Sequence, residues 1–511
     1  MLAAGLLIDQ LRALLSFGRS HTDQDQTILW YAGRELLSGK FYEPNFFGQR
    51  YNTTFEAIPG ALLHAAGLPW GTALPAATTL LVTLIWVLLA ATAYRLGQPI
   101  AALLALAAPL LMRVQYVLLF DAPRGVLAGD CAAALAMAIG LAARRHQTRV
   151  FSLVAIGGLA ILWDYAAALA VVPVLVYVVC SDWPRYRRRA GQTVRLVAVA
   201  TLPPLAWLLF TITWWSAHHS YLIYPAAASS LHWSVWVNNF DHLSAYVSYF
   251  APALAPVAGV AVFLLASGIV LVMVLAVRRR SLPLLLANCS LLVLLLLALT
   301  STSALLPGLY LAGSRILLPL PLAAWFLCFA ALDTAKRTRT QTQGPPRTNQ
   351  HVIAIVVVAT MSLIVTQINF STVATRSITP TVGVSIANPT QLSAYCAALT
   401  RVYRSTDAQL LATNNVNYAY GCAADDGLNT LIPTFYDRRG WLIQASLREP
   451  IQRILVSVPN CSYVAPSAGQ CTPEPVNVVL VRSHPVPAAH TLDRITGAHV
   501  MLGTWHLPNT R

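Results

Sequence analysis

Long apolar runs constrain this chain more than any other feature of its sequence. Residues 76–94, 254–277, 282–299 and 352–368 each form a nearly uninterrupted apolar stretch. A helix needs roughly 20 such residues to cross the hydrocarbon core of a bilayer, and a backbone inside lipid must satisfy its own hydrogen bonds. The short alternation of apolar and polar residues that is typical of a transmembrane barrel does not occur in these runs. The sequence therefore predicts a polytopic α-helical membrane protein.

The scarce charges of the chain predict its topology. Charged residues make up 10% of the sequence, whereas an ordinary soluble domain carries about 25%. We predict about eleven spans, over residues 1–18, 72–94, 98–119, 124–143, 150–163, 165–180, 193–215, 254–277, 282–303, 314–332 and 351–369. With the N-terminus inside, nearly every basic cluster falls in a cytoplasmic loop, as the positive-inside rule requires. A cleaved signal peptide is the alternative for the first span, and it leaves the other spans unchanged.

The net charge of +15 could suggest a nucleic-acid partner. We exclude that class because the basic residues lie in short clusters between apolar runs, which is how cytoplasmic loops are built. The expected location is the cell membrane, crossed many times, and the bacterial inner membrane is the favoured one.

An odd number of spans places the last part of the chain outside. We therefore divide the chain into a transmembrane domain, residues 1–370, and an extracytoplasmic C-terminal domain, residues 371–511. The C-terminal region contains the strand-like runs AQLLAT, RILVSV and VNVVLV between turn residues, which predicts a mixed α/β domain. Its cysteines could form two disulfides by any of three pairings, or remain reduced thiols, and they are Cys396, Cys422, Cys461 and Cys471.

Two long loops are expected outside the membrane, over residues 19–71 and 216–253. The first loop is unusually acidic for a chain with 19 Asp and Glu residues in total. Its segment DQTILWYAGRELL has the apolar spacing of an amphipathic helix, with Asp23 near the helix start and Asp25 in the first turn. Acids at that position stabilise a helix by capping it and by meeting its dipole. The alternative to this structural role is that one of these acids acts as a general base at the membrane surface.

Several short sequence motifs follow this acidic motif along the chain. HTDQDQ precedes GKFY at residues 39–42 and GQRY at residues 48–51. Later phrases are APRGVLAGDCAAALAMAIGL, GGLAILWDYAAALAVVPVLVY and AGSRILLPLPLAAW. Over roughly residues 20–330, the combination resembles GT-C-type glycosyltransferases, in particular the bacterial branch related to protein mannosyltransferases and to lipid A aminoarabinose transferases. The chain departs from that pattern at Asp-Gln-Asp, where many relatives have adjacent acids, at Asp164 and at Ile316. These departures bear on the acceptor more than on the reaction class.

The resemblance implies an integral-membrane glycosyltransferase, a GT-C-like enzyme with a polyprenyl-phosphate sugar as donor. It would transfer a hexose or pentose outside the membrane by an inverting displacement. Asp23 is the preferred base, and Asp25 would orient the acceptor or hold a cation together with Asp23 and His21. Arg315 and Arg124 are the expected partners of the donor phosphate, because an arginine beside a span needs an anion or a lipid headgroup. Further candidate substrate-binding residues are Tyr42, Gln49, Tyr51, Glu56, Trp163 and Asp164.

The sequence leaves the acceptor and the metal open. Protein, lipid and glycan all remain possible acceptors, and membrane lipid is an expected partner. No cofactor is required by these motifs, while a divalent cation stays an alternative because carboxylates can hold one. Rival functions are a flippase or transporter of lipid-linked saccharides, a polysaccharide ligase and a non-catalytic scaffold. A transporter would place ionisable residues at mid-membrane, whereas here they collect at the outer ends of the predicted spans.

Overall fold

The structure is a computed structural model of the chain. It describes residues 2–40, 45, 52–112, 124–217, 231–247, 269–270, 272–274, 276–277, 281–302, 315–340, 388–413, 416–428, 430–432, 441–442, 451–457, 477–486 and 500–506.

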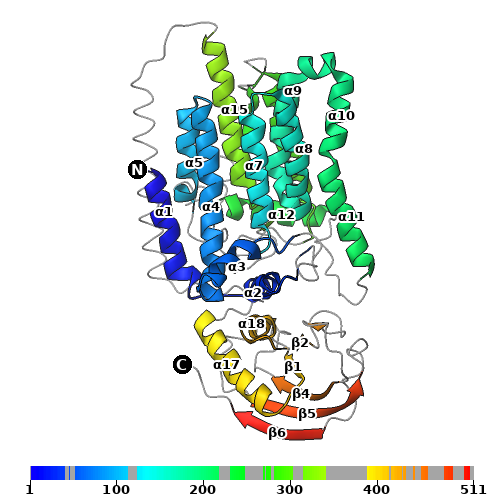
Figure 1. Cartoon of the computed structure of the whole chain (residues 1–511). Helices are drawn as coiled ribbons and strands as arrows, with labels where there is room; N and C mark the ends of the chain where they lie inside the picture. Colours follow the sequence, from blue (N-terminus) through cyan, green and yellow to red (C-terminus); the bar gives the residue numbers. More distant parts are fainter. Residues whose placement is uncertain are drawn as a thin grey trace.

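A bundle of apolar helices forms the larger part of the molecule (Figure 1). Its helices are α1 (Leu2–Ala13, continued by a π-helical turn over Leu14–Gly18), α4 (Trp70–Arg95), α5 (Pro99–Leu111), α7 (Leu127–Ala142), α8 (His146–Trp163), α9 (Ala168–Arg188, preceded by a 3₁₀ turn over Tyr165–Ala167), α10 (Ala190–Ala200), α11 (Leu202–Ala217), α14 (Leu282–Ala298) and α15 (Leu320–Thr340). Three further helices, α2 (Gln24–Leu37), α3 (Ala57–Ala65) and α12 (Trp233–Val247), lie in the two long loops.

Apart from spans 254–277 and 351–369, every predicted span contains a helix in the structure. Within the described residues, three helical stretches are long and apolar enough to cross a membrane: Trp70–Arg95, Tyr165–Arg188 and Ala190–Trp214. Most of span 254–277 and all of span 351–369 lie outside the described residues, so the total of eleven spans stays a prediction.

Small residues allow the bundle helices to pack closely. A Cβ on Gly140 of α7 would come within 2.7 Å of the Leu153 side chain of α8. Gly157 of α8 meets Val171 of α9 in the same way, at 2.6 Å. Because lipid is as apolar as a side chain, helices in a membrane associate through such close contacts. The helices α7, α8 and α9 therefore form a closely packed frame at whose end the acidic loop lies.

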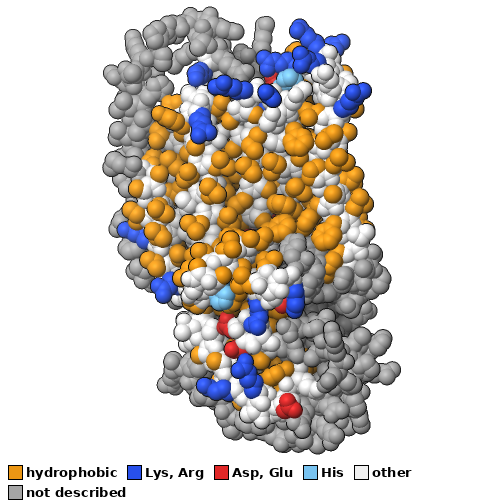
Figure 2. Space-filling view, in the orientation of Figure 1, with side chains coloured by type: hydrophobic (Ala, Val, Ile, Leu, Met, Phe, Trp, Pro, Cys, Tyr) orange, Lys and Arg blue, Asp and Glu red, His pale blue; other side chains and the backbone are white. Residues whose placement is uncertain are grey.

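The types of side chain on the surface of the bundle change along its length. Figure 2 shows a broad apolar band, with Lys and Arg gathered at one end of it. That end includes the last turn of α9, with Arg185, Arg187 and Arg188. The opposite end carries α2, α3 and the C-terminal elements (Figure 1). The charge distribution agrees with the sidedness that the positive-inside rule predicts.

The C-terminal elements form a mixed sheet with two helices. They are α17 (Pro389–Ser405), β1 (Leu410–Thr413), α18 (Val416–Asp426), β2 (Thr430–Ile432), β3 (Trp441–Leu442), β4 (Ile451–Ser457), β5 (Asn477–Val486) and β6 (Val500–His506). The strand order is β3-β2-β1-β4-β5-β6. Strand β1 is parallel to β2 and β4, and the other pairs are antiparallel.

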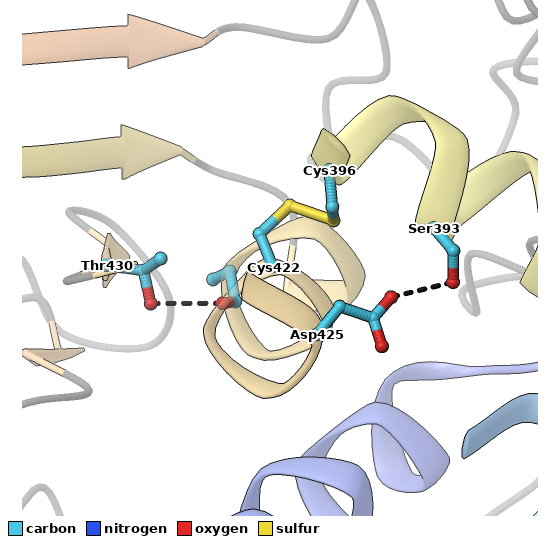
Figure 3. The surroundings of a disulfide bond; sticks show 6 residues. Ser393, Cys396, Cys422, Asp425 and Thr430 are labelled. Atoms are coloured by element: carbon cyan, nitrogen blue, oxygen red, sulfur yellow. Dashed lines mark hydrogen bonds between the residues drawn. A yellow bond between two sulfur atoms is a disulfide. The ribbon is translucent and has the colours of Figure 1, made fainter. Parts of the chain in front are cut away.

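One disulfide joins the two helices of this region. Cys396 of α17 is bonded to Cys422 of α18 (Figure 3). Both cysteines are fully buried, in an apolar cluster that also contains residues of α2. Cys461 and Cys471 lie outside the described residues, so the second predicted pairing is untested. The location of this region outside the membrane likewise stays a prediction.

Candidate active site

The start of α2 positions both acids of the acidic motif. Asp23 is the N-cap residue, with an extended backbone (φ −127°, ψ −178°), and its Oδ1 accepts a hydrogen bond from the Gln26 N–H at 3.0 Å. Asp25 follows in the first turn. The predicted helix with its capping acid is therefore confirmed. Capping uses one oxygen of Asp23 and leaves Oδ2 for a second partner.

Arg124 is that partner. It precedes α7, and its Nη2 lies 2.7 Å from Asp23 Oδ2, while Nη1 is 3.9 Å from Asp25 Oδ2. Arg124 is 1% exposed and Asp23 is 0% exposed. Removing one member of a buried ion pair leaves an uncompensated charge, at a typical cost of about 3–5 kcal/mol. The pair is thus held firmly at the end of the bundle.

Arg315 approaches the same motif from the segment before α15. Its Nη2 donates a hydrogen bond to Asp25 Oδ2. The Arg315 side chain is 14% exposed, which makes it the most accessible member of these ion pairs. Two guanidinium groups from distant parts of the chain thus converge on Asp23 and Asp25.

Glu56 holds the segment that carries Arg124. Its Oε2 accepts a hydrogen bond from the Arg124 N–H at 2.8 Å, and its Oε1 accepts one from the Leu127 N–H. A carboxylate at the start of α7 also meets the positive end of the helix dipole. Burial raises the pKa of Glu56, and the backbone N–H groups at Gly125, Leu127 and Arg124 oppose that rise. The predicted candidate Glu56 therefore braces Arg124 through its backbone.

Asp164 ends α8 beside this cluster. Its Oδ1 accepts a hydrogen bond from the Ala166 N–H at 3.0 Å, and its Oδ2 has no partner among the described residues. Burial raises the pKa of Asp164 to about 7, although the Arg315 guanidinium lowers it. The preceding Trp163 packs edge-on against Phe55, with ring centroids 4.9 Å apart, and against Trp207 of α11 at 6.0 Å. An aromatic wall therefore stands next to the acids.

Asp130 is a buried acid near this cluster that the sequence analysis did not single out. It lies in the first turn of α7, is fully buried, and neither of its carboxylate oxygens has a partner among the described residues. Its neighbour Gly129 packs on Asp164, since a Cβ on Gly129 would come within 2.6 Å of the Asp164 Cβ. The signal was present in the sequence, because an ionisable residue inside an apolar span indicates a functional position.

The remaining candidates are not all testable. Tyr42, Gln49 and Tyr51 lie outside the described residues. His21 stacks on Phe17, with ring centroids 4.5 Å apart, and its Nδ1 lies 2.7 Å from Ser20 Oγ. In the part of the chain that the structure describes, no three His, Cys, Asp or Glu side chains are arranged to hold a metal ion.

The described site thus combines paired acids and guanidinium groups in a buried setting. Guanidinium groups recognise phosphate through charge-assisted hydrogen bonds. A carboxylate can take a proton from an attacking hydroxyl or amine. In such a setting electrostatic interactions are stronger than in water.

Comparison with known proteins identifies the fold. No protein-family model and no curated protein sequence matches the chain. Among solved structures, ArnT from Cupriavidus metallidurans bound to undecaprenyl phosphate aligns with a TM-score of 0.51 at 14% identity, over 93% of this chain and 96% of that chain. The apo state of the same ArnT aligns with a TM-score of 0.49 at 14% identity, over 88% of this chain and 91% of that chain. The resemblance that the sequence motifs indicated is confirmed at the level of the fold: this chain has the GT-C membrane fold of ArnT.

Proposed function

We propose that this protein is an integral-membrane glycosyltransferase that transfers a sugar from a polyprenyl-phosphate donor to an acceptor outside the membrane. The observation that carries the proposal is the buried array in which Asp23 pairs with Arg124 and Asp25 with Arg315. Its place also supports a lipid-linked donor, because α2, which carries both acids, lies at one end of the apolar bundle (Figure 1), where a membrane-embedded tail can bring a phosphate.

The two arginines are proposed to bind the donor phosphate. The solved ArnT structure with the same fold contains undecaprenyl phosphate. In a glycosyl transfer from a phosphodiester, the leaving phosphate gains one negative charge as its bond to the sugar breaks. Groups that stabilise this developing charge lower the barrier, and a guanidinium suits the task. Arg315 is the accessible member and would meet the phosphate first.

Asp23 is proposed as the general base. The acceptor oxygen or nitrogen attacks the anomeric carbon, the bond to the phosphate oxygen breaks, and polyprenyl phosphate leaves with the electron pair. The proton of the acceptor moves to Asp23 Oδ2. Protonation there weakens the ion pair with Arg124 and so frees that guanidinium as the phosphate gains charge. A single displacement of this kind inverts the anomeric centre.

The environment of Asp23 suits this role. Burial raises its pKa above the ordinary value for Asp, although the Arg124 guanidinium lowers it, the neighbouring Asp25 raises it and the Gln26 N–H lowers it. A base is most effective when its pKa lies closer to the working pH. We therefore propose that Asp25 orients the acceptor and anchors Arg315, while Asp23 takes the proton.

The test is turnover by the purified protein. The substrate is a set of polyprenyl-phosphate hexoses and pentoses with water-soluble and lipid acceptors, and the readout is release of polyprenyl phosphate. We expect Asp23→Asn to lower kcat by about 10²–10⁴-fold, the usual contribution of a general base. Arg315→Ala should mainly raise the donor KM. The wild-type kcat/KM should show an acidic limb above the usual Asp range of about 4, and Asp23→Asn should lack it.

A matched control is available at the opposite end of the bundle. Asp182 is a largely buried carboxylate that pairs with Arg149 and Arg185, each at 3.2 Å. Asp182→Asn should keep the wild-type kcat and donor KM. If Asp23→Asn, Asp25→Asn and Asp182→Asn all turn over like the wild type, the acidic motif is structural. Binding of the donor without any turnover would favour a flippase.

A further inference from the structure

We propose that the disulfide-linked helices α17 and α18 hold α2 in place, so that Arg34 and Asn417 are positioning residues for the transfer reaction. This inference rests on the proposed function, because α2 carries the two acids of the site. A helix of 14 residues is only marginally stable by itself in water. Its position must therefore come from the elements that pack against it.

Arg34 links the last turn of α2 to the end of α18. Its Nη1 donates a hydrogen bond to the Ala424 carbonyl oxygen at 2.6 Å. A cation at the C-terminal end of a helix satisfies free carbonyl groups and meets the negative end of the dipole. Gly427, directly after the end of α18, has a positive φ of 71°, and a Cβ there would lie 2.3 Å from Arg34 Nη2. Glycine therefore leaves the space in which the guanidinium lies.

Asn417 reaches the other end of α2. Thr27 Oγ1 and Asn417 Oδ1 lie 3.4 Å apart, and both residues are buried. The Thr27 N–H also donates to the Asp23 carbonyl oxygen at 3.0 Å. The contact therefore falls on the helical turn that begins with the proposed base. The Arg34–Ala424 and Thr27–Asn417 contacts thus join α18 to α2 near both ends of α2.

Apolar packing joins α2 to the C-terminal helices between these polar contacts. Ile28, Leu29 and Tyr31 of α2 belong to one buried cluster with residues of α17 and α18. Tyr31 lies against Tyr420 of α18, with ring centroids 5.8 Å apart. The cluster is separate from the core of the transmembrane bundle. The C-terminal region is therefore part of the support of α2 rather than a distant appendage.

The disulfide makes α17 and α18 one unit. Cys396 is bonded to Cys422, and one turn further along Ser393 Oγ donates to Asp425 Oδ2 at 2.6 Å (Figure 3). The start of α17 rests on the bundle, since a Cβ on Gly71 of α4 would come within 2.3 Å of Pro389. The disulfide-linked pair of α17 and α18 therefore contacts α4 and packs against α2. Small misplacements of a catalytic group lower a rate strongly, by up to about 10²-fold for 1 Å.

The experiment compares variants of the full-length protein. They are Arg34→Ala, Arg34→Lys, Asn417→Ala, the double variant Cys396→Ser with Cys422→Ser, and the control Arg401→Ala, which removes an exposed arginine of α17. We expect Arg34→Ala and the double variant to lower kcat about tenfold, with the donor KM within twofold. The donor KM should change less than kcat, because Arg315 lies on another element and Arg124 is also held through its backbone by Glu56. Arg34→Lys should recover part of the activity, and Arg401→Ala should match the wild type.

Hydrogen exchange provides a readout that does not depend on turnover. In Arg34→Ala and the double cysteine variant, the amides of α2 should exchange faster while those of α7 and α8 keep their wild-type rates. Unchanged exchange in α2 would overturn the inference, and so would a loss of kcat that only parallels a lower melting temperature of the whole protein. If the wild type turns over no donor, the proposed function fails, whereas the exchange result still decides whether these helices hold α2.

Discussion

At the scale of single residues, the buried carboxylate of Asp164 predicts how stability depends on pH. The pKa of Asp164 is raised from 3.8 to about 7, chiefly by burial; the Ala166 N–H and the Arg315 guanidinium oppose the rise, and Glu56 adds to it. The folded state therefore binds this proton more tightly than the unfolded state. Stability from this group is fully present below pH 3.8 and is lost as the pH rises towards 7, because the unfolded state then ionises at lower cost.

The substitution Asp164→Asn should remove this dependence. Asparagine caps a helix nearly as well as aspartate, so the hydrogen bond from the Ala166 N–H can persist. Between pH 5 and 7 the wild type should lose stability relative to the variant, by an amount on the order of 1–2 kcal/mol, because one pKa unit corresponds to roughly 1 kcal/mol. Thermal unfolding in detergent across that pH range measures it. Parallel curves for the two proteins would mean that Asp164 does not hold a proton in the folded state.

At the scale of elements, the contact between α7 and the end of α8 predicts the effect of a single methyl group. A Cβ on Gly129 would lie 2.6 Å from the Asp164 Cβ and 3.1 Å from the Ala160 carbonyl oxygen. Gly129→Ala should therefore separate α7 from the α8 end. We expect the free energy of unfolding to fall by about 1–3 kcal/mol, as overpacking usually causes, and the turnover of donor to fall with it.

Gly191→Ala is the matched control for that prediction. Gly191 also lies in a helix, α10, but no atom of the described residues lies within 4 Å of its Cβ position. Alanine there should be neutral or stabilising by up to about 1 kcal/mol, because alanine favours helix. Unfolding in denaturant, measured side by side, distinguishes the two glycines. Equal effects of both substitutions would show that the close approach at Gly129 does not constrain the packing.

The elements also show which features a sequence can predict. The described bundle helices and α2 were predictable because apolar runs, helical spacing and a capping aspartate are local signals. The pairing of Arg124 with Asp23 was not, since phosphate was the expected partner of the arginine. Glu56 accepts hydrogen bonds from backbone N–H groups at the start of α7, which the sequence did not indicate, and its predicted contact with substrate stays a prediction. Contacts between residues far apart in the chain leave no local pattern.

At the scale of the whole molecule, the ends of the bundle differ in charge and in structure. The basic last turn of α9 lies at one end, and α2 with the C-terminal elements lies at the other (Figure 1, Figure 2). The positive-inside rule predicts that the basic end lies in the cytoplasm. Because α18 packs on α2, we predict that both lie on the same, outer side. The sequence predicted the two regions as outer segments, but it could not predict that they touch, because they are separated by most of the chain.

This sidedness predicts the accessibility of single cysteines in intact cells. Ser405 at the exposed end of α17 and Arg187 in the exposed last turn of α9 are suitable positions. A membrane-impermeant maleimide should label Ser405→Cys without permeabilisation, because we predict that α17 lies on the outer side. It should label Arg187→Cys only after permeabilisation, and the wild type supplies the background from native cysteines. Labelling in the reverse order would place α2 and its acids in the cytoplasm, where the transfer proposed for the outer face could not occur.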